Sequence, residues 1–323
     1  MKYIRSPLRV SLFGGGTDFA DYFQNNRGKV IGFAINRFVN VFGSNIELNQ
    51  DFILRLSYRI NEEVNNLSDI KHPIYRTILQ KYKMNDPYHF MSFSSLPSNS
   101  GLGSSSSFTV GIVAILKSIF NEELSANKIA REAIDIERNL LNESGGWQDQ
   151  LHSAYRGINC FDFYGNDFTE NKINLSSENL DILDSSSFLL YTGLNRDASN
   201  IEKSKMQKLG ESELNQIYQI ACEGEKCMLS GKLSLMEIGQ LLNENWKLKK
   251  SLSSQVSNNL IDDMYESIIK EGAFGAKICG AGGGGFFYLL AEDHIADKIK
   301  SKFSKAALIK IKTFDDVINV ENI

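Results

Sequence analysis

The sequence predicts an α+β protein, in which strands and helices are grouped rather than regularly alternating. Strand-like runs rich in β-branched and aromatic residues fill much of the first half of the chain and return near its end. Three helical stretches lie together between them, at about 213–229, 235–252 and 259–271. At 323 residues the chain is long enough for two domains.

The remaining elements follow from local patterns. Further strands are expected at 8–13, 30–42, 52–58, 88–93, 158–164, 188–191, 276–279, 286–290 and 308–311. Further helices are expected at 73–82, 108–120, 126–141 and 294–303. The polar segment 181–187 is the expected domain boundary, which divides the chain into domains 1–185 and 186–323.

Composition excludes several classes of function. The net charge of −4 gives no electrostatic basis for binding nucleic acid or an anionic membrane. The four cysteines and four histidines are scattered, so neither a disulfide framework nor a zinc site is expected. The N-terminus has no apolar leader and no apolar run is long enough to span a membrane, so a cytoplasmic location is the simplest expectation.

Residues 97–107 read Pro-Ser-Asn-Ser-Gly-Leu-Gly-Ser-Ser-Ser-Ser, between a strand-like run and an apolar helical run. Small residues let the backbone approach a ligand, and the start of the helix offers unpaired N–H groups to an anion such as phosphate. The segment is not a P-loop, because Gly-Lys-Ser/Thr is absent, and the His-Arg-Asp and Asp-Phe-Gly signatures of protein kinases are absent as well. A flexible serine linker is the alternative, which the flanking strand and helix disfavour.

A second glycine-rich segment, residues 145–150, reads Gly-Gly-Trp-Gln-Asp-Gln. Asp149 in this setting suits a carboxylate that orients a hydroxyl group or accepts its proton during phosphoryl transfer. The structural alternative is an aspartate that only caps the following helix.

Glu137 is expected on the buried side of the helix at 126–141. The apolar stripe of that helix consists of Ala130, Ala133, Ile134, Leu140 and Leu141. A buried carboxylate requires a partner, and Mg²⁺ shared with substrate phosphates is one suitable partner. A salt bridge to a nearby arginine is the alternative.

Two further segments complete the set. Residues 280–285 contain Gly-x-Gly-x-x-Gly, but a strand follows rather than a helix, so a dinucleotide site is excluded. This run suits a backbone wall against a ligand, and a plain glycine-rich hairpin is the alternative. Near the N-terminus, Arg9 suits phosphoryl charge, and Asp18, which follows Gly14-Gly15-Gly16-Thr17, suits sugar hydroxyls.

Taken in order, these segments resemble the GHMP kinase superfamily, which includes galactokinase, homoserine kinase and mevalonate kinase. The matching motifs are 6–18, 97–107 and 277–285, together with Gly-Gly-Trp-Gln-Asp149-Gln. The first motif looks most like the D-glycero-D-manno-heptose 7-phosphate kinase branch. Galactokinases have Gly-Glu-His-Thr-Asp where this chain has Gly14-Gly-Gly-Thr-Asp18, which argues against galactose as the substrate.

The resemblance implies ATP and Mg²⁺ as cofactors, with Asp149 as the catalytic aspartate and Arg9 as the basic residue that assists it. Ser105 aligns with the Mg²⁺-binding serine of the family and Glu137 with its Mg²⁺-binding glutamate, although one extra residue separates Glu137 from Asp149. The implied ATP-binding residues are Pro97, Ser100, Gly101, Leu102, Gly103, Ser104, Ser105 and Ser106. The implied substrate-binding residues are Gly15, Gly16, Asp18, Gly146, Arg196, Gly282 and Gly283.

The implied fold is an N-terminal domain like ribosomal protein S5 domain 2 and a C-terminal ferredoxin-like domain, with the active site in a cleft between them. The implied reaction phosphorylates the C1 hydroxyl of D-glycero-D-manno-heptose 7-phosphate, which feeds nucleotide-activated heptose for capsule or surface polysaccharide. Arg196, with Lys203 or Lys205, is the candidate holder of the 7-phosphate. The alternatives are another sugar-1-kinase, such as a fucokinase-like enzyme, and a catalytically silent sugar sensor. The sequence does not fix the oligomeric state, and a homodimer is one option.

Overall fold

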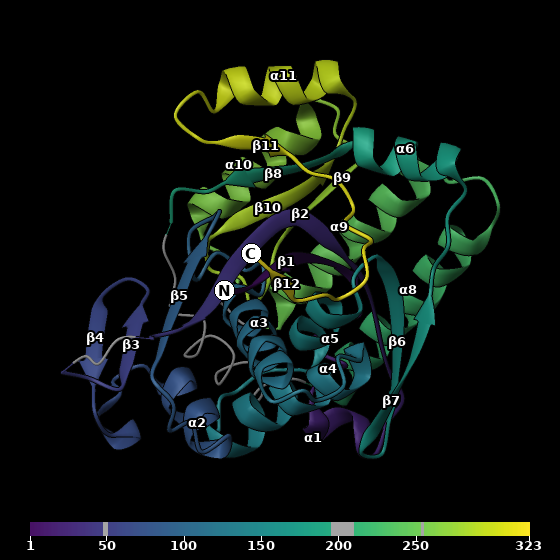
Figure 1. Ribbon diagram of the computed structural model, residues 1–323. Helices are drawn as coiled ribbons and strands as arrows, with labels where there is room; N and C mark the ends of the chain where they lie inside the picture. Colours follow the sequence, from purple (N-terminus) through teal and green to yellow (C-terminus); the bar gives the residue numbers. More distant parts are fainter. Residues whose placement is uncertain (48–50, 195–209, 253–254) are drawn as a thin grey trace.

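The computed structural model describes residues 1–47, 51–194, 210–252 and 255–323, which form two β-sheets with helices packed on them (Figure 1). The first sheet has eight strands in the order β12-β1-β2-β5-β3-β4, with β6 pairing with β2 and β7 pairing with β6. Its strands are β1 (Lys2–Phe13), β2 (Gly28–Asn45), β3 (Leu54–Ser57), β4 (Asn61–Val64), β5 (Tyr88–Ser94), β6 (Ile158–Tyr164), β7 (Asp167–Lys172) and β12 (Glu321–Asn322). β3 runs parallel to β5, and the other neighbours are antiparallel.

The second sheet is antiparallel and has the order β11-β8-β10-β9. Its strands are β8 (Ser187–Tyr191), β9 (Gly275–Ile278), β10 (Phe286–Leu290) and β11 (Leu308–Lys310). Helices connect β8 to β9 and β10 to β11, which gives the βαββαβ arrangement of a ferredoxin-like unit, as expected.

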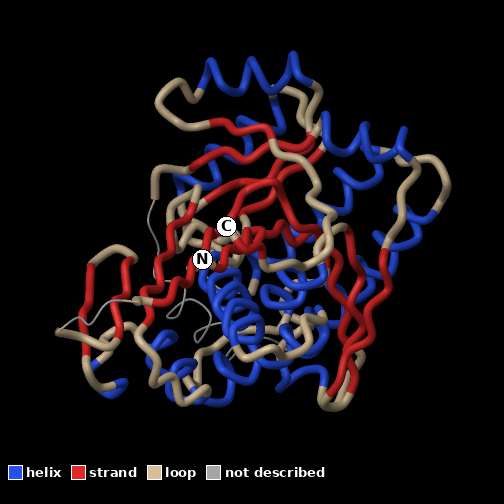
Figure 2. The backbone as a smooth tube through the Cα atoms, in the orientation of Figure 1, coloured by secondary structure: helices blue, strands red, loops and turns tan. Residues whose placement is uncertain are grey.

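The helices lie on the faces of the two sheets, and Figure 2 shows those of the first half gathered below the first sheet in this view. They are α1 (Ala20–Phe23), α2 (Pro73–Lys81), α3 (Ser104–Ile119), α4 (Ala126–Ile134), α5 (Gln148–Tyr155), α6 (Ser177–Ser185), α8 (Glu211–Leu229), α9 (Leu235–Ser251), α10 (Asn259–Lys270) and α11 (Asp293–Lys302). A short 3₁₀ helix spans Leu67–Asp69. α3 and α5 pack on β1 and β2, whereas α9 and α10 pack on β9.

Several contacts join the two halves of the molecule. α8 packs on β1 and β2 of the first sheet as well as on α9. The Lys29 ammonium of β2 lies 2.6 Å from Glu225 Oε2 of α8 and 2.9 Å from Asp162 Oδ1 of β6. The end of the chain returns to the first sheet, where β12 pairs with β1. One hydrophobic core therefore extends from the first sheet into the second half of the chain.

The helix predicted at 126–141 changes its winding at Asp135. α4 ends at Ile134, and a π-helix covers Asp135–Leu140. Glu137 lies within this π-helix, and π-helical turns are rare and occur often at functional sites. Glu137 is buried as predicted, but the apolar stripe differs from the prediction, because Ile136 is buried and Leu140 is 50% exposed.

The other predicted helices and strands are present, with ends shifted by a few residues. The largest shift is in β1, which begins at Lys2 rather than at 8. α3 begins at Ser104 rather than at 108, so the four serines form its first turn. β4, β7, β12 and the helices α1, α5 and α6 were not predicted, since they are short or polar. Among the described residues, no helix combines the length and apolar character needed to cross a membrane.

Candidate active site

A cavity of about 440 Å³ lies between the two halves of the molecule. One wall, which we call the N-wall, is formed by residues of β1, the serine loop, the π-helix and the start of α5. The opposite wall, the C-wall, consists of Asn245, Lys249, Leu252, Lys277, Gly280 and Ala281. The cavity thus brings together the four glycine-rich or polar segments that the sequence singled out.

Arg9 connects three of these segments. Its Nε and Nη2 lie 2.8 and 2.7 Å from Asp149 Oδ1, and its Nη1 donates to the Gly101 carbonyl. Its backbone N–H donates to the Leu102 carbonyl over 3.1 Å. The Arg9 side chain is only 4% exposed, so these contacts fix the serine loop and Asp149 relative to strand β1.

Asp149 is the second residue of α5, and Trp147 is the N-cap residue of this helix, so Asp149 does not cap it. Its side chain is 26% exposed and lines the cavity. Both Arg9 contacts go to Oδ1 rather than to Oδ2. A carboxylate in the first turn is also stabilised by the positive end of the helix dipole.

The serine loop presents the start of α3 to the same cavity. Gly103 precedes the helix with φ +72°, and a Cβ there would lie 3.3 Å from Arg9 Cγ and 3.4 Å from Asp149 Oδ2. No side chain of the described residues caps this helix, so its first N–H groups remain available to an anion. Gly101, Gly103 and Ser104–Ser106 line the cavity, whereas Ser100 and Leu102 are buried beneath it and Pro97 lies outside its lining.

Glu137 is 1% exposed, and the serine that contacts its carboxylate is Ser106, whereas the predicted role of Ser105 in binding Mg²⁺ stays a prediction. Ser106 Oγ donates to Glu137 Oε2 over 2.8 Å, and Gln150 Nε2 donates to the same oxygen. The alternative of a salt bridge to an arginine is also present, but it is long: Arg138 Nη2 lies 3.5 Å from Glu137 Oε2. Consecutive helical residues point about 100° apart, so Ser105 and Ser106 do not face the same carboxylate.

The surroundings of Glu137 fit a hard cation. Within the described part of the chain, Glu137 Oε1 is buried and has no hydrogen-bond partner, although the residue lines the cavity. Burial, and next the charge of Glu137, raise the pKa of the neighbouring Glu143. Carboxylate and hydroxyl oxygens beside bound phosphates are suitable Mg²⁺ ligands.

Arg138 holds the loop that leads to Asp149. Its Nε and Nη2 donate to the Gly146 carbonyl over 3.2 and 3.0 Å, and its Nη1 donates to the Glu143 carbonyl over 3.2 Å. Gly145 has φ +154°, and a Cβ there would lie 2.9 Å from the guanidinium carbon. The absence of a side chain at Gly145 therefore lets the arginine lie close to this loop.

Asp18 has a structural position rather than the expected place beside sugar hydroxyls. It is fully buried and accepts hydrogen bonds from the N–H groups of Gly16 (2.9 Å) and Gln148 (3.0 Å). Burial raises its pKa. A Cβ on Gly146 would lie 1.9 Å from Asp18 Oδ2, so Asp18 joins the first glycine motif to the loop before Asp149 and is not part of the cavity lining.

Gly15, Gly16 and Gly146 line the cavity as expected, together with two side chains that the sequence analysis missed. These are Ser11 and Gln148, whose Oγ and Oε1 atoms are buried without a hydrogen-bond partner among the described residues. Buried polar atoms that lack a protein partner and lie at the edge of a cavity can form hydrogen bonds with the hydroxyl groups of a ligand.

The glycine run at 280–285 joins the two halves of the protein more than it lines the cavity. A Cβ on Gly285 would lie 2.2 Å from the Ser100 carbonyl oxygen, and the Phe286 N–H donates to the same oxygen over 3.2 Å. Gly282 and Gly283, expected at the substrate, instead pack on Val256, to whose carbonyl Gly283 N–H donates over 2.8 Å. The alternative of a glycine-rich turn between two strands therefore describes this part of the run.

Behind Asp149, His152 is completely buried on α5. Neither ring nitrogen has a hydrogen-bond partner in the described part of the chain. Burial, and next the charge of Arg9, lower its pKa to about 3. His152 is therefore neutral at neutral pH and cannot act as a cation in the cavity.

The C-wall residues Asn245, Lys249 and Lys277 were not predicted as site residues. One signal for Lys277 was available in the sequence, because a lysine interrupts the apolar run of the strand expected at 276–279. The expected phosphate-binding residues Arg196, Lys203 and Lys205 lie outside the described residues.

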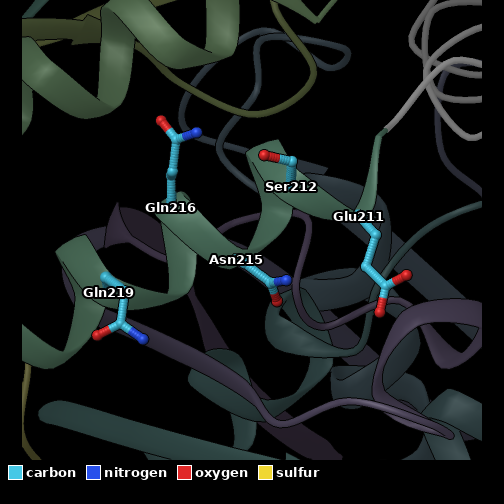
Figure 3. A pocket seen from close by; sticks show the side chains of 5 residues that line it. All are labelled: Glu211, Ser212, Asn215, Gln216 and Gln219. Carbon is cyan, nitrogen blue, oxygen red and sulfur yellow. The ribbon is translucent and has the colours of Figure 1, made fainter.

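A second hollow, of about 520 Å³, lies along α8 (Figure 3). Its five lining residues, Glu211, Ser212, Asn215, Gln216 and Gln219, all belong to the first turns of this helix. It contains none of the glycine-rich segments, so we assign the active site to the cavity between the two halves.

Comparison with known proteins identifies the family of this chain. Residues 68–157 match the model of the GHMP kinases N terminal domain, and residues 230–309 match the GHMP kinases C terminal model. The chain is 30% identical to a D-glycero-alpha-D-manno-heptose 7-phosphate kinase of Campylobacter jejuni over 308 residues, which covers 90% of each chain. It is 25% identical to a bifunctional fucokinase/GDP-fucose pyrophosphorylase of Arabidopsis thaliana, with 97% of this chain matching 32% of that protein.

Solved structures share the fold. A D-glycero-D-manno-heptose 1-phosphate kinase from Bacteriodes thetaiotaomicron aligns over 100% of this chain and 99% of its own, with a TM-score of 0.80 and 20% identity. Galactokinase from Lactococcus lactis aligns over 100% of this chain and 95% of its own, with a TM-score of 0.73 and 16% identity. With both domain models matched and a relative at 30% identity over nine tenths of its length, the chain belongs to the GHMP kinase family.

Proposed function

We propose that this protein is an ATP-dependent sugar kinase that phosphorylates the C1 hydroxyl of D-glycero-D-manno-heptose 7-phosphate to give the 1,7-bisphosphate. The observation that carries the proposal is the Arg9–Asp149 pair, which faces the cavity beside the uncapped start of α3. An anion site next to a fixed carboxylate and guanidinium suits phosphoryl transfer to a hydroxyl group.

In this proposal the serine loop holds the ATP phosphates through the N–H groups at the start of α3 and the hydroxyls of Ser104 and Ser105. Arg9 fixes Asp149, and Asp149 Oδ2 accepts a hydrogen bond from the C1 hydroxyl. Asp149 then orients that oxygen toward the γ-phosphorus and accepts its proton. Ser11, Gln148 and the backbone of Gly15, Gly16 and Gly146 contact the remaining hydroxyls of the sugar.

Glu137 and the serines at the start of α3 would hold Mg²⁺. When bound, the ion would neutralise charge on the transferring phosphate. The hydrogen bond from Ser106 to Glu137 favours Ser106 as the hydroxyl nearest to the ion, whereas the family resemblance favours Ser105. Buried Gln150 fixes the orientation of the Glu137 carboxylate.

The heptose phosphate is proposed from the Campylobacter jejuni relative and from the absence of the glutamate and histidine that galactokinases carry in the first motif. Its product would feed nucleotide-activated heptose for surface polysaccharide. We further propose a division into domains 1–185 and 186–323, with the last strand returning to the first sheet. The cleft between the domains would close on its substrates, as clefts of this kind usually do.

The test is a coupled assay of ADP release with Mg·ATP and a panel of sugars. The panel contains D-glycero-D-manno-heptose 7-phosphate, sedoheptulose 7-phosphate, fucose, galactose and mannose. Selective turnover of the manno-heptose phosphate is the expected result. Selective turnover of fucose would retain the kinase and replace the substrate, and it would agree with the fucokinase relatives. No turnover with ATP still bound would favour the sensor alternative.

A further inference from the structure

Lys277 is a buried lysine that reaches from one half of the molecule to the other. It lies on β9, is 3% exposed and lines the cavity from the C-wall. Its Nζ donates to the Leu12 carbonyl of β1 over 2.8 Å and to Asn245 Oδ1 of α9 over 3.2 Å. Both acceptors are uncharged, so neither balances a positive charge on the lysine.

The charged groups that act most strongly on Lys277 include two cations. They are Lys249 of α9 and Arg9 of β1, which both lower the pKa of Lys277. The thiol of Cys279, two residues further along the chain, acts in the opposite direction. Within the described part of the chain, no carboxylate lies within ion-pair distance of Lys277 Nζ. Lys249 also lines the cavity, where its Nζ donates to the Gly280 carbonyl.

Lys29 shows how the same protein accommodates a structural buried lysine. Lys29 is 6% exposed, but its ammonium contacts the carboxylates of both Glu225 and Asp162. Burial alone would lower the pKa of Lys29, and these two carboxylates raise it instead. For Lys277, burial and the charge of Lys249 act in the same direction and hold the pKa well below its usual value.

The hydrogen bonds of Lys277 fit an uncharged amine. A neutral amine has two N–H groups, which match its two neutral acceptors, and protonation adds a third donor. That third donor and the new charge require an anion, and a phosphate group offers both a charge and acceptor oxygens. The cavity that Lys277 lines is the one to which the proposed function assigns phosphorylated substrates.

We propose that Lys277, with Lys249 beside it, forms a phosphate-binding subsite on the C-wall, and that Lys277 takes up a proton from solvent when a phosphoryl group binds there. This inference depends on the proposed function for the identity of the phosphoryl group. Two sources share the required chemistry: the γ-phosphate of ATP and the phosphate that the sugar already carries.

Calorimetry at pH 8 separates these sources without requiring turnover. Binding is measured in buffers of different ionisation enthalpy, which reports the protons taken up. One titration uses Mg·AMP-PNP, and the next adds D-glycero-D-manno-heptose 7-phosphate to the AMP-PNP complex, with inorganic phosphate in its place if the sugar does not bind. At pH 8 a phosphate monoester is already largely deprotonated, since its second pKa is about 6.

We expect uptake of up to about one proton in one of the two titrations of the wild type, and its loss in Lys277→Met. Uptake with AMP-PNP assigns the subsite to the γ-phosphate, and uptake with the second ligand assigns it to the acceptor. If neither titration of the wild type shows uptake, the proposal is wrong. Uptake with inorganic phosphate, when the heptose phosphate does not bind, would retain the subsite and reject the proposed substrate.

Steady-state kinetics give a second measurement. In Lys277→Met the KM of the ligand whose phosphate binds there should rise about 10- to 100-fold, as expected for loss of a charged hydrogen bond. Lys277→Arg should recover part of this loss. Lys247→Met, on an exposed face of the same helix as Lys249, is the matched control and should behave as the wild type. A folded Lys277→Met enzyme with both KM values within about twofold of the wild type would overturn the subsite.

Discussion

The two walls of the cavity differ in how their charged groups are balanced. On the N-wall, Asp149 is paired with Arg9, and Glu137 accepts hydrogen bonds from Ser106 and Gln150. On the C-wall, Lys277 contacts only a carbonyl and an amide oxygen among the described residues. The carboxylates of Asp149 and Glu137 therefore have charged or polar partners within the protein, whereas in the proposal above a bound phosphate balances the charge on Lys277. Substitutions on the N-wall should mainly change kcat, and those on the C-wall should mainly change KM.

The largest effect is expected for Asp149→Asn. This change removes the proton acceptor but keeps the shape of the side chain, so kcat should fall by about 10²- to 10⁴-fold while ATP binding is retained. Turnover and the Kd of AMP-PNP are the measurements, and Asp21→Asn, at an exposed position of α1, is the control. Near-normal turnover would remove Asp149 from the catalytic role and reduce the contrast between the two walls.

The contact between the serine loop and the glycine run at 280–285 is tested by Gly285→Ala. Gly285 has φ +87°, and a Cβ would meet the Ser100 carbonyl at 2.2 Å. Gly231 has a similar φ of +83°, but a Cβ there would meet nothing within 4 Å. Gly231→Ala should therefore reduce the free energy of unfolding by only about 1–2 kcal/mol, the cost of the left-handed backbone.

Gly285→Ala should reduce the free energy of unfolding by clearly more, about 3 kcal/mol or above, since the close contact adds to the backbone strain. Urea unfolding of both variants gives the comparison. Gly285→Ala should also raise the KM of ATP, because Ser100 belongs to the serine loop. Equal losses of stability in the two variants would show that the contact between Gly285 and Ser100 does not limit the packing of the walls.

The pH dependence of stability tests the buried histidine behind Asp149. The pKa of His152 is about 3 in the folded protein and roughly 6.5 in an unfolded chain, so the unfolded state binds more protons between these values. The free energy of unfolding should therefore fall as the pH drops from 6.5 toward 3, by roughly 2–3 kcal/mol between pH 7 and pH 4.5.

His152→Leu should remove this part of the acid sensitivity, whereas His294→Leu, at an exposed histidine of α11, should not. Chemical unfolding at pH 7 and pH 4.5 is the measurement. Wild type and His152→Leu with the same difference between the two pH values would show that His152 is protonated without penalty in the folded protein.

Smaller effects are expected from substitutions at the proposed Mg²⁺ site, which involves Glu137 and one of the serines at the start of α3. Glu137→Gln should raise the Mg²⁺ concentration needed for half-maximal activity by about 10- to 100-fold, because it removes the charge that would hold the ion. If Ser106 is the serine nearest to the ion, Ser106→Ala should raise this concentration more than Ser105→Ala. The reverse order would support the family alignment and show that the Ser106–Glu137 hydrogen bond rearranges when the metal binds.

The sequence by itself predicted the class of fold, most helices and strands, and the position of the N-wall. These predictions succeeded because hydrophobic periodicity and glycine-rich segments are local signals. Asp149, Glu137 and the serine loop occupy the cavity because each lies next to an element that the sequence already predicts.

Only the tertiary structure decided which distant residues meet. The π-helix at Asp135–Leu140 turned Glu137 toward Ser106 and moved Leu140 to the surface, which a regular helical pattern does not predict. Asp18 was assigned to sugar hydroxyls by its motif, but two backbone N–H groups and burial give it a structural place instead. The Lys277 side chain lines the cavity and extends from β9 to the Leu12 carbonyl of β1, in the other half of the chain. The contacts of Asp18 with Gln148 and of Lys277 with Leu12 join residues more than a hundred positions apart, and their energies depend on burial and partners that no local pattern contains.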